Sequence, residues 1–427
     1  MDRFFGILGI IAILGLAFLM SNNKKRVNWH TIISGLILQI LLALFVLKTT
    51  LGKFIFEKIA DCINKLLEFS NFGGDFVFGV LTKTNLHHNE LFGTFGDYLF
   101  ALKLIPTIVF VAVLVAIAYH LGIMQRVVSF IAKIVYKLMK VSGSEALSNV
   151  SSAFVGQVEA QLMIKPYVPT MTMSELLASM SGSLACLAGG VMAVYIGLGV
   201  PAEYLLTASI MAMPGALVIS KLVWPETEKS ETANTISLEV KKNHVNLIDA
   251  IAHGASDGMR ISINVIAMLI GFIALIAMIN AILGKFGMWI FDITGIESIL
   301  GVSLTSLSLK SILGAIFSVF AFLMGVPFSE AAQVGSLMGT KLVVNEFVAY
   351  LDLLPMIRDG VLSNKSIIIA SFALCGFANL GSIAIQIGGI GEIAPNRKED
   401  LAKLGVKALV CGTLASYLSA TIAGIIL

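Results

Sequence analysis

Seven stretches of this chain are almost wholly apolar and long enough to cross a lipid bilayer. They are Phe4–Met20, Thr31–Leu47, Leu102–Ile123, Ala202–Leu222, Ile261–Leu283, Ile367–Ile387 and Leu404–Leu427. A helix needs about 20 mainly apolar residues to span the hydrocarbon core. Only 13% of the 427 residues are charged, and a soluble domain could not bury this much apolar surface. The chain is therefore predicted to be an all-α polytopic membrane protein, embedded in the lipid bilayer of a cell membrane.

The low charge and the scattered cysteines exclude other classes of protein. A nucleic-acid-binding protein needs basic stripes that neutralise phosphates, and the chain has too few basic residues for them. The four cysteines, Cys62, Cys186, Cys375 and Cys411, form no CxxC or Cys/His cluster. The sequence therefore predicts no disulfide framework, no structural zinc site and no bound cofactor.

The distribution of basic residues indicates an orientation in the membrane. Lysines and arginines gather at Lys24–Arg26, Arg126–Lys140 and Arg397–Lys403, and such loops usually face the cytoplasm. This places the N-terminus outside, provided that some apolar segments turn back without crossing. Leu51–Phe69 and Gln125–Lys140 separate apolar from charged residues by helical face. That pattern is typical of helices lying along the membrane surface, and of amphipathic helices docked on other helices.

The remaining apolar segments are interrupted at mid-length by glycines and polar residues. These segments are Leu147–Val168, Thr172–Val200, Leu309–Val348 and Ile367–Ile387. Non-helical backbone at membrane depth is tolerated only inside protein or beside a cavity. A re-entrant hairpin, a broken helix and a span occur twice in the same order, which predicts an inverted-repeat transporter with a site near the midplane. A passive solute channel and an intramembrane enzyme are the alternatives, although the histidines form no HExxH motif.

This order divides the chain into four units. Residues 1–141 hold N-terminal spans and interfacial helices that are largely scaffold, and residues 223–306 hold a cytoplasmic loop, an interfacial helix and a long scaffold span. The two repeats are residues 142–222 and 307–427. Each repeat consists of a hairpin, a broken helix and the span that follows it.

Two carboxylates lie at the interruptions. Glu159 follows the tip of the first hairpin, and Glu346 lies within an apolar run. Placing such a charge at mid-span costs about 2.5–3.5 kcal/mol, so it usually has a function. Each could pair with a lysine on its own segment, Lys165 or Lys341. Alternatively, both accept hydrogen bonds from a polar, uncharged ligand.

Neutral polar residues beside the carboxylates favour the ligand hypothesis. Asn379 and Ser382, spaced i,i+3, present an amide and a hydroxyl on one face of a broken helix, and Gln157 adds a second amide. Phe377 is either a ring-stacking residue or an ordinary core residue. This set suits hydroxyls and amide-like ring edges, and no arginine cluster is present for a phosphate.

The interrupted segments resemble those of the concentrative nucleoside transporters. The matching residues are Gly156-Gln157-Val158-Glu159-Ala160, Ile164-Lys165-Pro166-Tyr167, Gly254-Ala255-Ser256-Asp257-Gly258, Gly325-Val326-Pro327-Phe328-Ser329-Glu330, Lys341-Leu342-Val343-Val344-Asn345-Glu346-Phe347-Val348-Ala349-Tyr350 and Gly376-Phe377-Ala378-Asn379-Leu380-Gly381-Ser382-Ile383-Ala384. The resemblance implies about eight transmembrane helices, two re-entrant hairpins and interfacial helices, assembled as a homotrimer. It also implies an elevator-type symporter that imports nucleosides such as uridine, driven by a cation gradient, and not an enzyme.

The resemblance assigns roles to individual residues. Gln157, Val158 and Glu159, with Val191, would surround the nucleobase. Glu346, Asn379 and Ser382 would bind the ribose hydroxyls, with Phe377 beside the sugar. Family members usually have Thr where this chain has Val158 and Pro where it has Gln161. The missing hydroxyl removes one hydrogen bond near the base, so the base preference stays open.

The resemblance also implies a candidate cation site formed by Ser152, Val155, Cys186 and Leu187. In sodium-coupled relatives an Asn side chain and a hydroxyl assist backbone carbonyls, and the matching residues here are Ser152 and Cys186. A hard cation prefers oxygen ligands, for which a thiol is a poor substitute. Ser152 also matches the pattern of proton-coupled bacterial members. We therefore expect H+ coupling, with Na+ as the alternative, and Glu346 is the candidate proton carrier.

Overall fold

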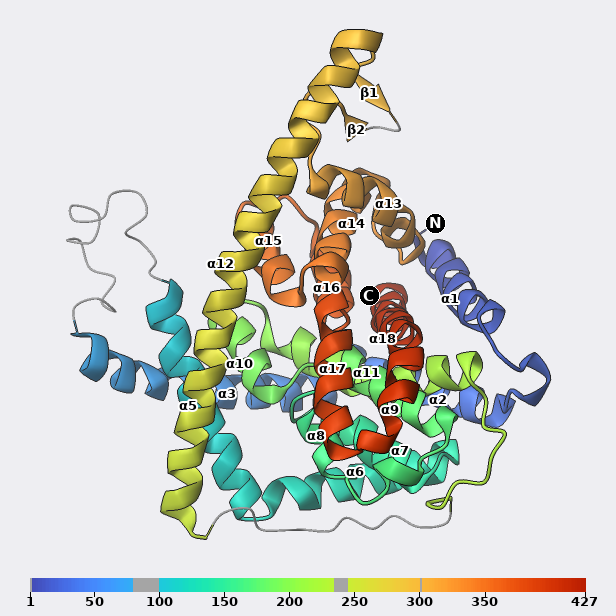
Figure 1. The fold of residues 1–427 in the computed structure, drawn as a ribbon, viewed down its shortest axis with the longest axis vertical. Coiled ribbons are helices and arrows are strands. Elements are labelled where there is room, and N and C mark those ends of the chain that lie inside the picture. Colours follow the sequence, from blue (N-terminus) through green and yellow to red (C-terminus); the bar gives the residue numbers. More distant parts are fainter. Residues whose placement is uncertain (1, 80–99, 234–244, 300–301) are drawn as a thin grey trace.

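The computed structural model describes residues 2–79, 100–233, 245–299 and 302–427, which are mostly helical (Figure 1). The helices before residue 234 are α1 (Asp2–Leu19), α2 (Trp29–Lys48), α3 (Thr50–Phe78), α5 (Phe100–His120), α6 (Ile123–Met139), α7 (Gly143–Ser152), α8 (Glu159–Leu162), α9 (Met173–Ala185), α10 (Gly189–Gly197) and α11 (Ala202–Val223). Those that follow are α12 (Leu247–Thr294), α13 (Leu309–Leu323), α14 (Phe328–Val343), α15 (Glu346–Arg358), α16 (Asn364–Leu374), α17 (Leu380–Ile393) and α18 (Lys398–Ile426). Short 3-10 turns are η1 (Lys24–Arg26), η4 (Val168–Thr170) and η5 (Pro395–Arg397), and β1 (Ser298–Ile299) pairs antiparallel with β2 (Val302–Ser303).

The predicted spans lie in helices. Five helical segments are each long and apolar enough to cross a bilayer: α2, α9 with α10, α11, α12 and η5 with α18. The apolar helix α1 and the pair α16 and α17 are shorter, and α5 meets α6 at a bend of 75°. If α1, α5 and the broken pair α16–α17 are counted with these five, the described residues contain eight candidate spans, the number that the resemblance implies. The predicted fold class is confirmed.

Two helical hairpins turn back on themselves, as the interrupted segments predict. In the second hairpin α13 and α14 meet at 117°. In the first, α7 ends at Ser152 and the chain turns through Gly156 before the short α8 begins at Glu159. Each hairpin precedes a broken helix, α9–α10 or α16–α17. The spans α11 and α18 then complete the two repeats.

The centre of the fold is formed by α9, α11, α16 and α18, which pack against one another (Figure 1). Most side chains of α11 and α18 are buried within the chain, because both helices are surrounded by the other elements. Capping boxes define where α7 and α9 begin: Ser142 pairs with Glu145, and Thr172 pairs with Glu175. Each box satisfies backbone N–H groups that a helix start leaves free. The same local chemistry therefore positions the hairpin and the broken helix of the first repeat.

The two helix breaks contact each other in this core. Gly376, in the break between α16 and α17, has φ +121°, which lies in the region that favours glycine. A Cβ atom on Gly376 would lie 2.5 Å from the carbonyl oxygen of Ala185, at the end of α9. Ser209 of α11 lies between the breaks, where its Oγ accepts hydrogen bonds from the Leu187 N–H (3.3 Å) and the Cys375 thiol (3.9 Å). The backbone that is not helical is therefore enclosed by protein.

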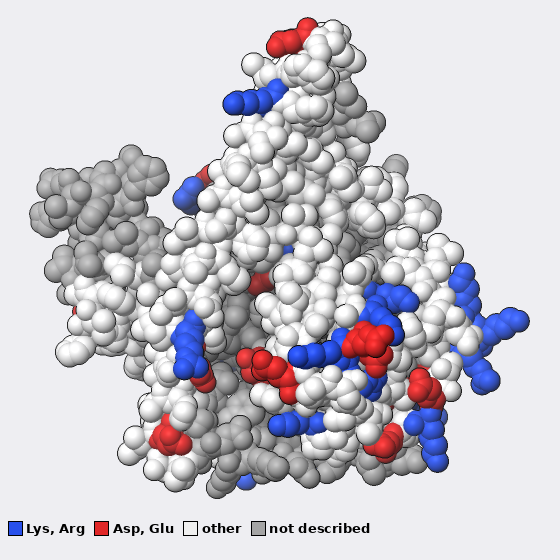
Figure 2. Space-filling model, in the orientation of Figure 1, with Lys and Arg blue, Asp and Glu red and all other residues white. Residues whose placement is uncertain are grey.

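The helix α12 is one continuous element of 48 residues, about 72 Å long, and therefore longer than a bilayer is thick. It packs closely on α5 because Gly254 and Gly258 face that helix. A Cβ atom on either glycine would lie within 3 Å of the α5 backbone. Residues 261–284 carry no charge, and Figure 2 shows the corresponding length of α12 in white. The apolar side chains of its other faces, such as Ile270, are exposed in the single chain.

The two predicted surface helices correspond to α3 and α6. On α3 the predicted apolar residues Leu51 and Phe54 are exposed, whereas Phe56 and Ala60 are buried against the protein. This arrangement leaves apolar side chains available to lipid. In the unit 223–306 the sequence predicts an interfacial helix followed by a span, and the structure has the single helix α12 there. Residues 234–244 of the predicted loop lie outside the described residues.

The contact between the two breaks yields a stability prediction. We expect Gly376→Ala to lower the unfolding temperature in detergent, because alanine at this φ costs about 1–3 kcal/mol and its Cβ would clash with Ala185. Gly388→Ala is the matched control, since a Cβ atom on Gly388 of α17 meets no atom within 4 Å. A thermal melt in which both variants unfold at the wild-type temperature would contradict the prediction.

Candidate functional site

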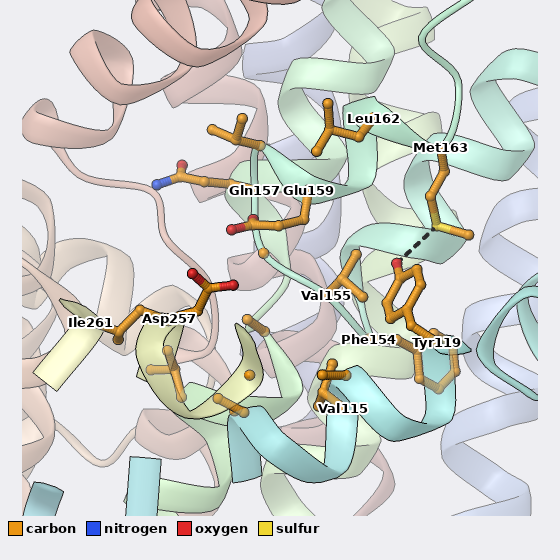
Figure 3. A pocket seen from close by; sticks show the side chains of 18 of the residues that line it. Val115, Tyr119, Phe154, Val155, Gln157, Glu159, Leu162, Met163, Asp257 and Ile261 are labelled. Carbon is orange, nitrogen blue, oxygen red and sulfur yellow. Dashed lines mark hydrogen bonds between the residues drawn. The ribbon is translucent and has the colours of Figure 1, made fainter. Parts of the chain in front are cut away.

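A cavity of about 940 Å³ opens between the first hairpin and the helices α5 and α12 (Figure 3). Its walls include five residues predicted to bind solute: Gln157, Val158, Glu159, Val191 and Phe377. These residues come from the hairpin tip, from α10 and from the break between α16 and α17. The structure thus brings together in one cavity side chains that are up to 220 positions apart in the sequence (from 157 to 377).

Gln157 and Glu159 present hydrogen-bonding groups to this cavity. The Oε1 atom of Gln157 is buried and has no hydrogen-bond partner, which is costly unless a ligand or water supplies one. The side chain of Glu159 lies over Gly156, so that a Cβ atom at Gly156 would clash with its carboxylate. Glu159 and Lys165 both line the cavity without forming an ion pair. The structure therefore does not support the alternative in which Lys165 neutralises Glu159.

Val158 has a packing role that its position at the hairpin tip did not predict. A Cβ atom on Gly389 of α17 would lie 2.6 Å from both methyl groups of Val158. The valine therefore lies against a helix surface that has no side chain. This contact joins the tip of the first hairpin to the broken helix of the second repeat.

The other three predicted residues, Glu346, Asn379 and Ser382, form a separate buried cluster. Asn379 donates from Nδ2 to Glu346 (3.3 Å), and its Oδ1 accepts from the Ser382 N–H (2.9 Å). Tyr195 of α10 donates its hydroxyl to the other Glu346 oxygen (3.0 Å). Glu346 is only 6% exposed, and none of the three lines the cavity. Phe377 connects the two groups, because it lines the cavity and precedes Asn379 by two residues.

Two helix N-termini explain how a carboxylate is accommodated here. Glu346 is the first residue of α15, and Asn379 is the N-cap of α17. The N-terminus of a helix carries a partial positive charge and free N–H groups, which stabilise a nearby anion. Lys341 donates to backbone carbonyls instead of to Glu346. The alternative of a structural Glu346–Lys341 pair is therefore not what the structure shows.

The residues of the candidate cation site are brought near one another, but their side chains already have partners. The Ser152 hydroxyl donates to the Ser148 carbonyl (2.8 Å) and lies 2.9 Å from the Ser183 hydroxyl. The Cys186 thiol faces the carbonyl of Ser209 at 3.8 Å. Val155 and Leu187 would contribute only their backbone carbonyls. Among the described residues, no three His, Cys, Asp or Glu side chains are placed to hold a metal ion.

Gln161 belongs to a hydroxyl network that the sequence did not predict. Its Nε2 donates to Ser183 (2.9 Å) and Ser148 (3.2 Å), and its Oε1 accepts from Ser179 (2.6 Å). All four side chains are buried. The Gln161 side-chain amide therefore links the first hairpin to α9 by hydrogen bonds. The only signal in the sequence was the departure from the Pro usual in the family.

Two further residues of the site were missed by sequence reasoning. Tyr195 reaches Glu346 from 151 positions away, and nothing in its own segment marks it as polar. Asp257 lines the cavity from α12, opposite the first hairpin, and Figure 3 shows its carboxylate directed into the cavity. Its motif, Gly254–Gly258, forms part of the family resemblance, which assigns Asp257 no role. Its orientation follows from the Gly254 and Gly258 contacts that set the rotation of α12.

Comparison with known proteins identifies the family. The model for the C-terminus of Na+ dependent nucleoside transporters matches residues 204–424, the corresponding N-terminal model matches residues 8–81, and a nucleoside recognition (Gate) model matches residues 101–202. This chain belongs to the concentrative nucleoside transporter family. The nucleoside permease NupC of Helicobacter pylori is 36% identical to the transporter over 424 residues, covering 99% of this chain and 97% of the permease.

Other similar proteins agree. The uncharacterized transporter YutK of Bacillus subtilis is 43% identical over 426 residues, which is 99% of each chain. The solved structure of CNTnw in an inward-facing substrate-bound state is 41% identical, with a TM-score of 0.91, covering 100% of this chain and 98% of that one. The predicted family and elevator-type fold are thereby confirmed. Because the family consists of nucleoside transporters, the alternative of an intramembrane enzyme is excluded.

The buried cluster yields a prediction for transport. We expect Tyr195→Phe to raise the KM for nucleoside uptake by about five- to tenfold, since Glu346 loses a hydrogen bond worth about 1–1.5 kcal/mol. Tyr350→Phe is the matched control. The Tyr350 ring lies 4.5 Å from that of Tyr195, and its hydroxyl donates to the Ser371 carbonyl instead of Glu346. Equal KM values for the two variants would show that the Tyr195 hydroxyl does not act through Glu346.

Proposed function

We propose that this transporter is a secondary active symporter that imports nucleosides by coupling them to a proton gradient. The observation that carries the proposal is the pair of polar groups contributed by the two repeats. Gln157 and Glu159 line the cavity together with Phe377, and Glu346, Asn379 and Ser382 form the buried cluster. A nucleoside has the matching parts: a base with amide-like edges and a ribose with hydroxyls.

The chemistry of the two groups supports binding of the base by the first group and of the ribose by the second. The unpartnered Oε1 of Gln157 can accept from a ring N–H, while its amide N–H₂ can donate to a ring carbonyl. The Glu346 carboxylate already accepts from Tyr195 and Asn379, and it retains lone pairs for ribose hydroxyls. In this proposal Val158 and Val191 make apolar contact with the base, and Phe377 lies beside the sugar. Uridine is the first nucleoside to test.

The candidate cation site supports protons over sodium ions. Of its four residues, Ser152 already bonds within the protein, and Cys186 offers sulfur. Two backbone carbonyls are then the remaining oxygen ligands, fewer than a hard cation needs. The family model's description as Na+ dependent leaves sodium as the second hypothesis.

The proposal includes the assembly and orientation that the resemblance implies. The exposed apolar faces of α12 leave surface for lipid and for neighbouring copies in a homotrimer. The α5–α12 pair would be the fixed scaffold, and the two repeats would carry the solute in an elevator movement. The basic residues of η1, α6 and η5 support a cytoplasmic position for those segments, with the N-terminus outside.

Uptake of radiolabelled nucleosides into proteoliposomes tests the function. We expect uridine to accumulate above its external concentration under an inward proton gradient with no sodium present, because only a coupled carrier can concentrate its solute. A sodium gradient at constant pH should give no accumulation. Equilibration without accumulation under both gradients would indicate a passive channel, and accumulation with sodium alone would replace the proton hypothesis.

Replacement of Glu346 tests which group carries the proton. We expect Glu346→Gln to retain nucleoside exchange, with a raised KM, because glutamine can still accept from Tyr195. It should lose the nucleoside-driven pH change, since an amide does not titrate. Glu159→Gln serves as the control in the other polar group. Normal proton movement in Glu346→Gln would assign the coupling to another residue.

A further inference from the structure

Lys341 is a buried cation that neither the transport cycle nor the site described above uses. It lies in the last turn of α14, in the second hairpin, and is 1% exposed. Its Nζ donates to the carbonyl oxygens of Ala373 (2.9 Å) and Cys375 (3.4 Å). Burying a lysine at membrane depth is expensive, so its position calls for a specific role.

The two carbonyls lie where α16 ends and the break begins. The last carbonyls of a helix have no intrahelical partner and carry a partial negative charge. An ammonium group placed there satisfies those carbonyls and neutralises the helix end. The Ser416 hydroxyl donates to the same Cys375 carbonyl (2.8 Å), so the end of α16 is fully enclosed.

The equivalent position in the first repeat has no charged side chain among the described residues. There the helix α9 ends at Ala185, and Cys186 follows. The first hairpin contacts the last turn of α9 through two neutral side chains, Ser152 and Gln161, which both hydrogen-bond to the Ser183 hydroxyl. Both breaks begin with a cysteine whose thiol points to α11. Among the described residues, the repeats therefore match in construction and differ in that only the second has a basic side chain at its break.

Lys341 also connects the two segments that form the buried polar cluster. Five residues after Lys341 the chain reaches Glu346, and four residues after Cys375 it reaches Asn379. These two side chains hydrogen-bond to each other. The segments 341–346 and 375–379 are therefore joined at both ends, by the bond from Lys341 to the Cys375 carbonyl and by the bond between Asn379 and Glu346.

We propose that Lys341 is a resident cation: its ammonium occupies, in the second repeat, the place equivalent to the candidate cation site of the first, and it positions Glu346 and Asn379 for the solute. It is a positioning residue and does not touch the nucleoside. The proposal rests on the proposed function in that nucleoside binding is the readout.

Charge and hydrogen bonding are separated by two substitutions. We expect Lys341→Gln, which keeps an N–H donor without the charge, to raise the Kd of the purified protein for uridine by about tenfold, that is ~1.4 kcal/mol. Lys341→Arg, which keeps the charge, should stay within about threefold of the wild type. Lys310→Ala is the control, because Lys310 lies on α13 of the same hairpin and pairs with Asp352 at the surface. Equal Kd values for the Gln and Arg variants would overturn the proposal.

Rescue by small cations tests the role more directly. Lys341→Ala leaves a space at the end of α16, and we expect 100 mM ammonium or methylammonium to recover most of the lost uridine affinity relative to choline. The wild type and Lys310→Ala should not respond. A folded Lys341→Ala protein whose weakened binding no cation restores, or whose binding is not weakened, would refute the resident-cation role.

Folding of the variants is itself informative. If neutral variants give monodisperse protein only when ammonium is present during purification, the yield becomes the readout and supports the proposal. If they fail to fold in ammonium and in choline alike while Lys341→Arg folds, simple occupancy by a cation is insufficient and the proposal is wrong. If the wild-type protein shows no measurable binding of uridine, cytidine or adenosine, the proposed function is refuted instead.

Discussion

The structure depends on how the protein satisfies two breaks in helices that lie inside a membrane. Each break frees backbone groups that lipid cannot pair, at a cost of several kcal/mol per group. The chain solves this by placing the breaks against each other, with Gly376 on Ala185 and with Ser209 between them. The hairpins then close the remaining sides: the Gly189 N–H donates to the Phe154 carbonyl, and Lys341 donates to the end of α16.

The proposed solute site follows from the same arrangement. Because the breaks are enclosed by protein, polar side chains can lie at the N-termini of the helices beside them. Glu346 is the first residue of α15, and Asn379 is the N-cap of α17. The first hairpin supplies the other half of the site, and its tip contacts α17 through Val158 and Gly389. Both repeats are therefore needed to build one site. A carrier that must release its solute benefits from a site whose halves belong to separate repeats.

The helices α5 and α12 provide a different kind of surface. Their close contact through Gly254 and Gly258 leaves one wall of the cavity lined largely by small and apolar residues, to which Tyr119, His120 and Asp257 add polar groups. Few polar bonds connect this wall to the hairpin. Among those between described residues is the bond from the Tyr119 hydroxyl to the sulfur of Met163 (Figure 3). Such a weakly bonded interface suits movement of one part against the other.

The sequence by itself determined the spans, the two repeats and most of the residues of the proposed site, because hydropathy and interruptions are local properties of the chain. It identified Gln157, Glu159, Glu346, Asn379 and Ser382 as a polar set. Only the tertiary structure decided that this set divides into an open cavity and a buried cluster. It alone placed Tyr195 on Glu346 and Lys341 on the end of α16, since these bonds join residues 151 and 32 positions apart and depend on how the repeats pack. A pattern along the chain records which groups are costly to bury, and the packing decides which partner satisfies each of them.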